Sequence, residues 1–116
     1  MFSRSERLES LLKEEIALAL QHMKDFGAKG LLTITDVELS PDRKTAHVYY
    51  SFLGSDRDRE LMSDSLRAQA SLLRALVKKR VYLKVVPRLI FSYDETPRHA
   101  SRIDELLHKI EREHKA

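Results

Sequence analysis

Residues 31–53 read LLTITDVELSPDRKTAHVYYSFL, and this stretch decides the fold class. Its second half, Thr45 to Leu53, alternates between apolar and polar side chains, which is typical of a strand with one buried face. Its first half, Leu31 to Ser40, changes parity near Thr35-Asp36, so we expect a β-bulge there. Ser40-Pro41-Asp42-Arg43 has good turn chemistry, because proline presets φ at the second turn position. The stretch therefore predicts an antiparallel hairpin.

Helical patterns lie on both sides of this hairpin. Arg4 to Asp25 carries apolar residues every three or four positions, which predicts a first helix. Ser3 or Ser5 is its expected N-cap, and Gly27 is expected at the C′ position. The same spacing predicts a long helix from about Arg57 to Arg80, in which a small, polar middle favours close packing or a bend.

The remaining third of the chain predicts one more strand and one more helix. Leu89, Phe91 and Tyr93 alternate as a third strand after Pro87. Pro97 then breaks the chain, and a short last helix with Ile103 to Ile110 follows, with residues 113–116 frayed. The predicted class is α+β, a three-stranded sheet packed against helices in the order α-β-β-α(kinked)-β-α. We expect a single domain over residues 1–116.

Composition sets limits on the class of protein. The chain has 116 residues, of which 42% are hydrophobic and 34% charged, as in an ordinary globular domain. Cysteine is absent, which excludes disulfides and thiol chemistry and fits a reducing compartment. The first ten residues do not resemble a secretory signal, and no apolar run approaches the roughly 20 residues that cross a bilayer. We therefore expect a cytoplasmic protein without membrane contact.

The stretch from Arg67 to Arg88, RAQASLLRALVKKRVYLKVVPR, has a charge pattern unlike the rest of the chain. Between Asp64 and Asp94 there is no acidic residue, whereas elsewhere the two signs are mixed. A helix with one core face and a positive outer face is a plausible surface for a polyanion. The predicted RNA-binding residues are the basic residues of this block: Arg67, Arg74, Lys78, Lys79, Arg80, Lys84 and Arg88.

A solvated helix face is the ordinary explanation of such a run. Solvated faces normally interleave both signs, as residues 102–112 do. Arg67, Arg74 and Lys78 are spaced by seven and four, so they fall on one helical side, and the pattern favours nucleic-acid contact. Tyr82 is the one aromatic residue interleaved with the block, so phosphate contact is expected rather than base stacking.

Catalytic and metal-binding patterns are not found. The histidines show no H-x-x-x-H spacing, and no thiolate supplements them, so we expect no metal site, no cofactor and no enzyme. Gly27-Ala28-Lys29-Gly30 matches the GxxG pattern of KH RNA-binding domains, but it lies between a helix and a strand rather than between two helices. We interpret it as a helix stop and a turn.

Several segments together resemble the ribosome-binding factor A family. They are Thr33–Asp42 followed by Ala46–Phe52, then Leu73-Arg74, Val86–Asp94 and Arg102-Ile103 with Leu106-Leu107. The resemblance covers almost the whole chain. It implies a type II KH-like fold in which an interhelical kink of the form Ala-x-Gly replaces the GxxG loop. It also implies binding to the small ribosomal subunit during late, cold-sensitive assembly, in support of 5′-end maturation of its rRNA and without nuclease activity.

The sequence departs from the family pattern at three places. Gln69, Ala70 and Ser71 stand at the expected kink, and serine lacks the freedom of glycine at positive φ. We therefore expect a gentler kink or a different backbone at this interhelical junction. Lys84 stands where arginine is common, which keeps the charge and loses the bidentate fork. Ala100 replaces a common glycine before the last helix.

Pattern and resemblance together predict a non-enzymatic ribosome assembly factor. Its expected partners are the small ribosomal subunit and its rRNA, which it would contact through the basic block with Arg74 and Lys78 at the centre. We expect a monomer when the protein is free. The alternative is a protein-interaction module whose basic face binds an acidic protein.

Overall fold

The computed structural model describes residues 3–23, 26–81 and 83–95. The predicted last helix and the frayed end lie outside these residues. The single-domain assignment stays a prediction. The described elements are α1 (Arg4–His22), β1 (Leu31–Leu39), β2 (Thr45–Leu53), α2 (Asp56–Ala68), α3 (Ala70–Arg80) and β3 (Arg88–Tyr93).

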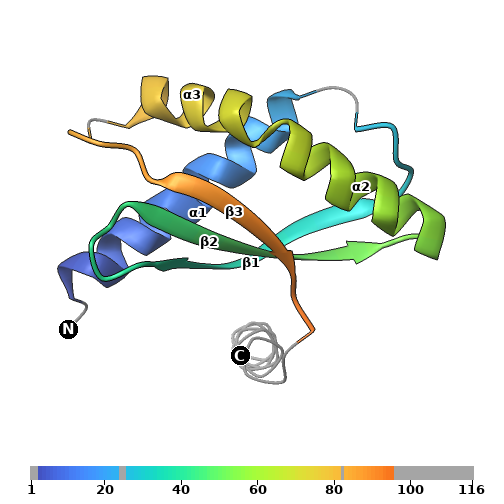
Figure 1. The fold of residues 1–116 in the computed structure, drawn as a ribbon, viewed down its shortest axis with the longest axis horizontal. Helices are drawn as coiled ribbons and strands as arrows, with labels where there is room; N and C mark the ends of the chain where they lie inside the picture. The colour runs from blue at the N-terminus through green and yellow to red at the C-terminus, as the bar shows by residue number, and fades with distance from the viewer. Residues whose placement is uncertain (1–2, 24–25, 82, 96–116) are drawn as a thin grey trace, which may run out of the picture.

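The strands form one mixed sheet with the order β1-β2-β3. β1 and β2 pair antiparallel as the predicted hairpin, and β2 and β3 pair in parallel. A parallel neighbour requires a crossover, and α2 and α3 supply it, as Figure 1 shows. The α+β class is confirmed, and the arrangement is compatible with the type II KH-like fold that the resemblance implies.

The predicted bulge in β1 is present. Ile34 pairs with Tyr50 and Asp36 pairs with Tyr49, which leaves Thr35 as the extra residue. The extra residue restores the parity of the strand, so that both Ile34 and Val37 are buried. At the far end of β1, the Leu39 N–H donates to Glu9 Oε2 of α1 at 2.8 Å. The outer edge of β1 is thus bent in its middle and bonded to a side chain at its end.

The core lies between one face of the sheet and the helices. Alternate residues of β2 form the sheet side of the core, and the helices contribute apolar side chains at helical spacing to its other side. This burial of apolar area is the main favourable term for the fold. The most deeply buried members include Leu12, Ile16, Ala46, Val48, Tyr50, Leu66, Leu73 and Val77.

Both ends of α1 were predicted, one correctly. Ser3 accepts from the Glu6 N–H at 3.1 Å, and the Glu6 carboxylate accepts from the Ser3 N–H, which makes a capping box. The predicted C-terminus is wrong, because the helix ends at His22 with Met23 as its C-cap. Met23 leaves the helix in an extended conformation, so no left-handed C′ residue is needed. Gly27, at φ +68°, serves the following loop instead.

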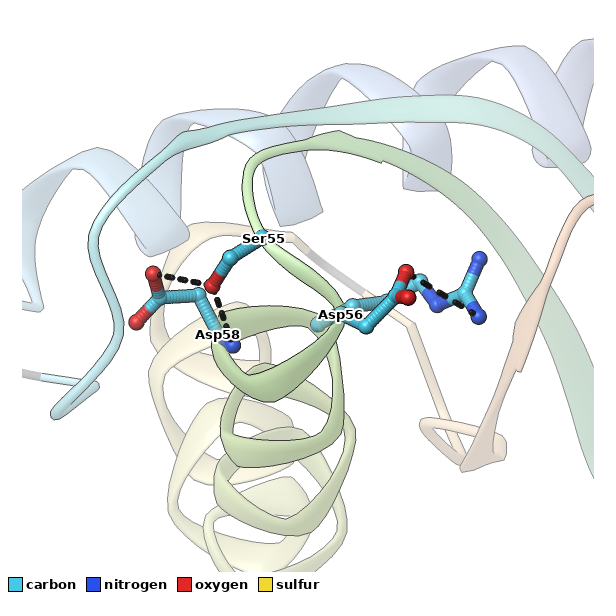
Figure 2. Close-up of polar contacts among 4 residues, drawn as sticks. Ser55, Asp56 and Asp58 are labelled. Carbon is cyan, nitrogen blue, oxygen red and sulfur yellow. Dashed lines mark hydrogen bonds and ion pairs between the residues drawn. The ribbon is translucent and has the colours of Figure 1, made fainter.

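The start of α2 is bonded to the loop that precedes β1. Figure 2 shows the Ser55 hydroxyl accepting from the Asp58 N–H and donating to its carboxylate at 2.7 Å. The other carboxylate oxygen of Asp58 accepts from the Lys29 N–H at 3.1 Å. The Ser55 hydroxyl and then the Lys29 N–H lower the pKa of Asp58. Asp56 and Arg59, also drawn in Figure 2, form an exposed ion pair at 3.9 Å.

The helix pair breaks at Gln69, which caps α2 and begins α3. The Gln69 N–H donates to Ser65 O and the Gln69 carbonyl accepts from Leu73 N–H, both at 2.9 Å. Gln69 itself has φ −101° and ψ 6°. This sparsely populated bridge region is open to any L-residue, so the direction changes without a glycine. In the described chain, Arg43 is the non-glycine residue with positive φ.

Two glycines enclose the ring of Phe52 near the end of β2. Gly30 has φ +155°, and a Cβ added there would lie 2.4 Å from Leu53 O and from Phe52 Cζ. A Cβ at Gly54 would lie 2.8 Å from Phe52 Cε1 and 2.9 Å from Lys29 O. All of these distances are too short for a side chain at either glycine, so the backbone itself covers this ring.

Candidate nucleic-acid interface

A groove of about 470 Å³ runs between the α2–α3 junction and β3. Ala70 and Ser71 have one or two side-chain heavy atoms each, so they leave space in the helix-side wall where α2 ends and α3 begins. The wall on the sheet side belongs to β3, which is an edge strand of the described sheet. The lining residues are Arg67, Ala70, Ser71, Arg74, Arg88, Leu89, Ile90 and Phe91.

Three of the seven predicted RNA-binding residues meet at this groove. Arg67 comes from α2, Arg74 from α3 and Arg88 from the first position of β3, and all three are exposed. Among the residues that the structure describes, no acidic side chain lines the groove. Each guanidinium presents up to five donors in a planar fork that fits phosphate oxygens. The groove therefore offers convergent anion-binding groups from three separate segments.

Backbone groups of β3 also point toward the groove. Arg88 N–H donates to Lys44 O at 2.9 Å and Asp94 N–H donates to Tyr50 O at 2.8 Å, both on the β2 side. Successive residues of a strand turn their backbone groups to alternate sides. The N–H and C=O groups of Leu89 and Phe91 accordingly face the edge away from β2. The groove thus has cations on both walls, and the β3 wall adds backbone donors and acceptors.

Arg74 is also bonded inside the protein. Its Nε and Nη2 atoms donate to the backbone carbonyl of Val86 at 3.0 and 2.7 Å. Val86 and Pro87 are buried, and they end the connector from α3 to β3. A proline has no N–H, so this segment has few backbone bonds of its own to hold it. Arg74 thus fixes the connector against α3, and a charge reversal at Arg74 tests the fold as well as the interface.

Substitution of Arg74 by alanine is expected to destabilise the fold by about 2 kcal/mol, because a buried carbonyl loses two charge-assisted hydrogen bonds. Arg74→Lys keeps the charge and makes at most a single-centre contact, so its loss should be smaller. Urea unfolding of the two variants beside wild type measures both effects. An Arg74→Ala protein as stable as wild type would show that the Val86 bond is not structurally important.

A second contact joins the other end of the helix pair to the sheet. The Arg59 guanidinium of α2 lies over the Tyr93 ring at the end of β3, 4.9 Å from the centroid. Tyr93 in turn packs edge-on against Tyr50, with 5.9 Å between ring centroids. Such contacts contribute modestly in energy but fix position. The helix pair is therefore held to the rest of the fold by Arg59–Tyr93 from α2 and by Arg74–Val86 from α3.

The other four predicted RNA-binding residues lie on different sides of the molecule. Lys78 is one turn beyond Arg74 on the same side of α3. Lys79 is exposed on the side away from the core, and Lys84 is exposed in the connector. Arg80 lies toward α1, where its guanidinium pairs with Glu15, which offsets its charge. One run in the sequence becomes several surfaces in the fold.

The sequence did not indicate the part that β3 plays in the groove. Leu89 and Phe91 were assigned to the third strand from their alternation alone. Their place in the groove depends on β3 being an edge strand beside the helix break. The helical crossover between the second and third strands was the one available signal, because it lays the helices over the sheet beside the third strand.

Other kinds of site receive no support. Within residues 3–23, 26–81 and 83–95, no three His, Cys, Asp or Glu side chains gather in a way that would hold a metal ion. His22 and His47 are exposed, and the other three histidines lie outside the described residues. None of the three described helices has the length and apolarity that a bilayer crossing requires.

Comparison with known proteins gives one consistent result. A family model described as ribosome-binding factor A matches residues 4–107. The ribosome-binding factor A of Halothermothrix orenii is 36% identical over 95% of this chain and 90% of that protein. That of Thermodesulfovibrio yellowstonii is 37% identical over 96% and 93%.

Solved structures agree with the sequence relatives. The crystal structure of ribosome-binding factor A from Thermus thermophilus superposes with a TM-score of 0.67 at 29% identity, covering 77% of this chain and 93% of that one. A homology model of the Thermus thermophilus factor, fitted into the cryo-EM map of its complex with the 30S subunit, superposes with a TM-score of 0.62 at 29% identity, covering 74% and 90%.

Proposed function

Because the chain belongs to the ribosome-binding factor A family, we propose that it binds the small ribosomal subunit by contacting its rRNA at the groove beside β3. The observation that carries this proposal is the convergence of Arg67, Arg74 and Arg88 on one groove. The relative fitted into a 30S complex supports the choice of subunit.

Phosphate contact is the main source of affinity in this proposal. Cations that neutralise phosphates release condensed counterions, which gives binding that is strong at low salt and largely independent of sequence. The backbone groups of Leu89 and Phe91 add hydrogen-bonding positions beside the three arginines. Such a surface positions an RNA segment without changing its covalent structure.

The proposed role in the cell follows from binding alone. The protein acts as a non-enzymatic assembly factor in the cytoplasm, as a monomer when free, and without a cofactor. By holding an immature rRNA arrangement, it supports late maturation and 5′-end processing of the small-subunit rRNA. This support is also needed in the cold. It dissociates when the mature rRNA fold competes better for the same contacts. A ligand shifts an equilibrium between two states only by the difference in its affinity for them.

The test is co-sedimentation of the full chain with small ribosomal subunits over a salt series. We expect the chain in the small-subunit fraction, with log affinity falling linearly with log salt at a slope of about −0.7 per phosphate contact if the contacted RNA is single-stranded. Chain that stays at the top of the gradient at low salt would contradict the proposal. Tight binding to an acidic protein together with negligible RNA affinity would favour the interaction-module alternative.

A further inference from the structure

The solvent side of α3 adjoins the groove at Ser71 and extends beyond it. Successive residues of a helix are about 100° apart, and buried Leu73 and Val77 mark the side that packs on the core. The opposite side carries Leu72, Ala75 and Lys79, all exposed. Figure 1 shows α3 along the upper margin of the molecule, where no other described element lies outside it.

The middle of this side of α3 is low because it carries small side chains, and cationic side chains lie before and after it. Ser71 and Ala75 are exposed and carry one or two side-chain heavy atoms each, so a partner can approach the helix backbone closely. Arg67 lies before them, and Lys78 and Lys79 lie after them. Ser71 and Lys78 are separated by two turns, about 10 Å along the axis. This shape and charge suit a partner whose surface is shallow and carries negative charge on both sides of the contact.

The charge and composition of this surface favour a nucleic acid whose bases are not exposed. No acidic residue occurs in residues 65–93, so the charge is complementary to phosphate along the whole helix. Residues 65–81 contain no aromatic side chain. Single-stranded RNA gains much of its affinity by stacking bases on aromatic rings, and α3 provides none. This face is therefore better suited to RNA whose bases are already stacked in a duplex.

We propose that the solvent side of α3 docks in the minor groove of double-stranded RNA. The minor groove of an A-form helix is wide and shallow and presents ribose 2′-hydroxyls, whereas the major groove is too narrow for side chains. Ser71 and Ala75 lie against the ribose rims, exposed Leu72 packs on sugar carbons, and the flanking cations contact phosphates. This inference rests on the proposed function and assigns a class of RNA to one helix.

Ala75 provides the sharpest test, because it is exposed and its enlargement adds no charge. Leucine has a helix propensity close to that of alanine, so Ala75→Leu fills the low middle of the surface with little effect on folding. Ala75→Ser is the matched control, since it stays small. The probes are an RNA hairpin of about 16 base pairs, the span of a known double-stranded RNA reader, and a single-stranded RNA with the same number of phosphates.

We expect wild-type full chain to bind the hairpin more tightly than the single strand at equal salt. Ala75→Leu should weaken hairpin binding about tenfold, equivalent to 1.4 kcal/mol, and leave single-strand binding and the thermal unfolding midpoint unchanged. Ala75→Ser should match wild type on both probes. This pattern would support minor-groove docking.

A wild-type preference for the single strand would overturn the inference, as would an Ala75→Leu variant that binds both probes like wild type or loses both equally. The small-subunit sedimentation assay separates this failure from that of the proposed function. Wild type that sediments with subunits but shows no hairpin preference would overturn the docking inference alone. Wild type that binds neither the subunits nor either RNA would overturn both.

Discussion

Charge reversal of Arg67 and Arg88 together is expected to weaken binding to the small ribosomal subunit roughly a hundredfold, since two phosphate contacts become two repulsive ones. Both side chains line the groove from different segments. Both are exposed, and neither has a bond like that between Arg74 and Val86. The variant should therefore fold, and its defect should appear in sedimentation at low salt.

A matched control is available on α1. Arg4 and Arg7 are exposed and lie away from the groove. Their reversal changes net charge by the same amount, from +3 to −1 when each of two cations becomes an anion. If the groove is the interface, this control should keep most of the affinity and show only a small long-range effect. Equal losses in the two variants would show that net charge, rather than the groove, governs binding.

Gly30→Ala is expected to cause a large loss of stability. At φ +155° a non-glycine residue is strained, which costs on the order of 1–3 kcal/mol. The added Cβ would also lie 2.4 Å from Leu53 O, which belongs to the backbone of the sheet and cannot yield as a flexible side chain does. Overpacking adds about 1–3 kcal/mol more. Equilibrium denaturation in urea measures the sum.

Gly27 separates the two causes of this loss. It also has positive φ, at +68°, but a Cβ there would meet nothing within 4 Å. Gly27→Ala should therefore show only the backbone cost, about 1–2 kcal/mol for a left-handed L-residue. A Gly30→Ala variant no less stable than Gly27→Ala would mean that the sheet end adjusts to the extra carbon at little cost.

The hairpin could be predicted because its signals are local. Thr45 to Leu53 was predicted at its observed bounds, and the bulge followed from the parity of Ile34 and Val37. The predicted end of α1 is wrong because Gly27 fits a helix stop in sequence, whereas Met23 leaves the helix in an extended conformation. The end of a helix also depends on neighbouring segments, which the pattern of the helix itself does not show.

The candidate site was predicted in composition but not in arrangement. Charge in sequence indicated seven cations, and it could not separate Arg80, which pairs with Glu15 across 65 positions, from Arg67 and Arg88, which line the groove. Helical spacing placed Arg67, Arg74 and Lys78 on one side. The bond from Arg74 to Val86 depends on how the connector returns to β3, which is a tertiary property.

The two outer edges of the sheet differ in their capacity to recruit another strand. A long flat edge is a template for unwanted pairing between molecules, and bulges or side-chain blocks suppress it. β1 has both, with Thr35 interrupting its ladder and Glu9 occupying the Leu39 N–H. The β3 edge has the cationic groove instead, where another polypeptide strand would meet three arginines. Pairing with another strand is therefore disfavoured at β1 by the bulge and by Glu9, and at β3 by the positive charge of the groove.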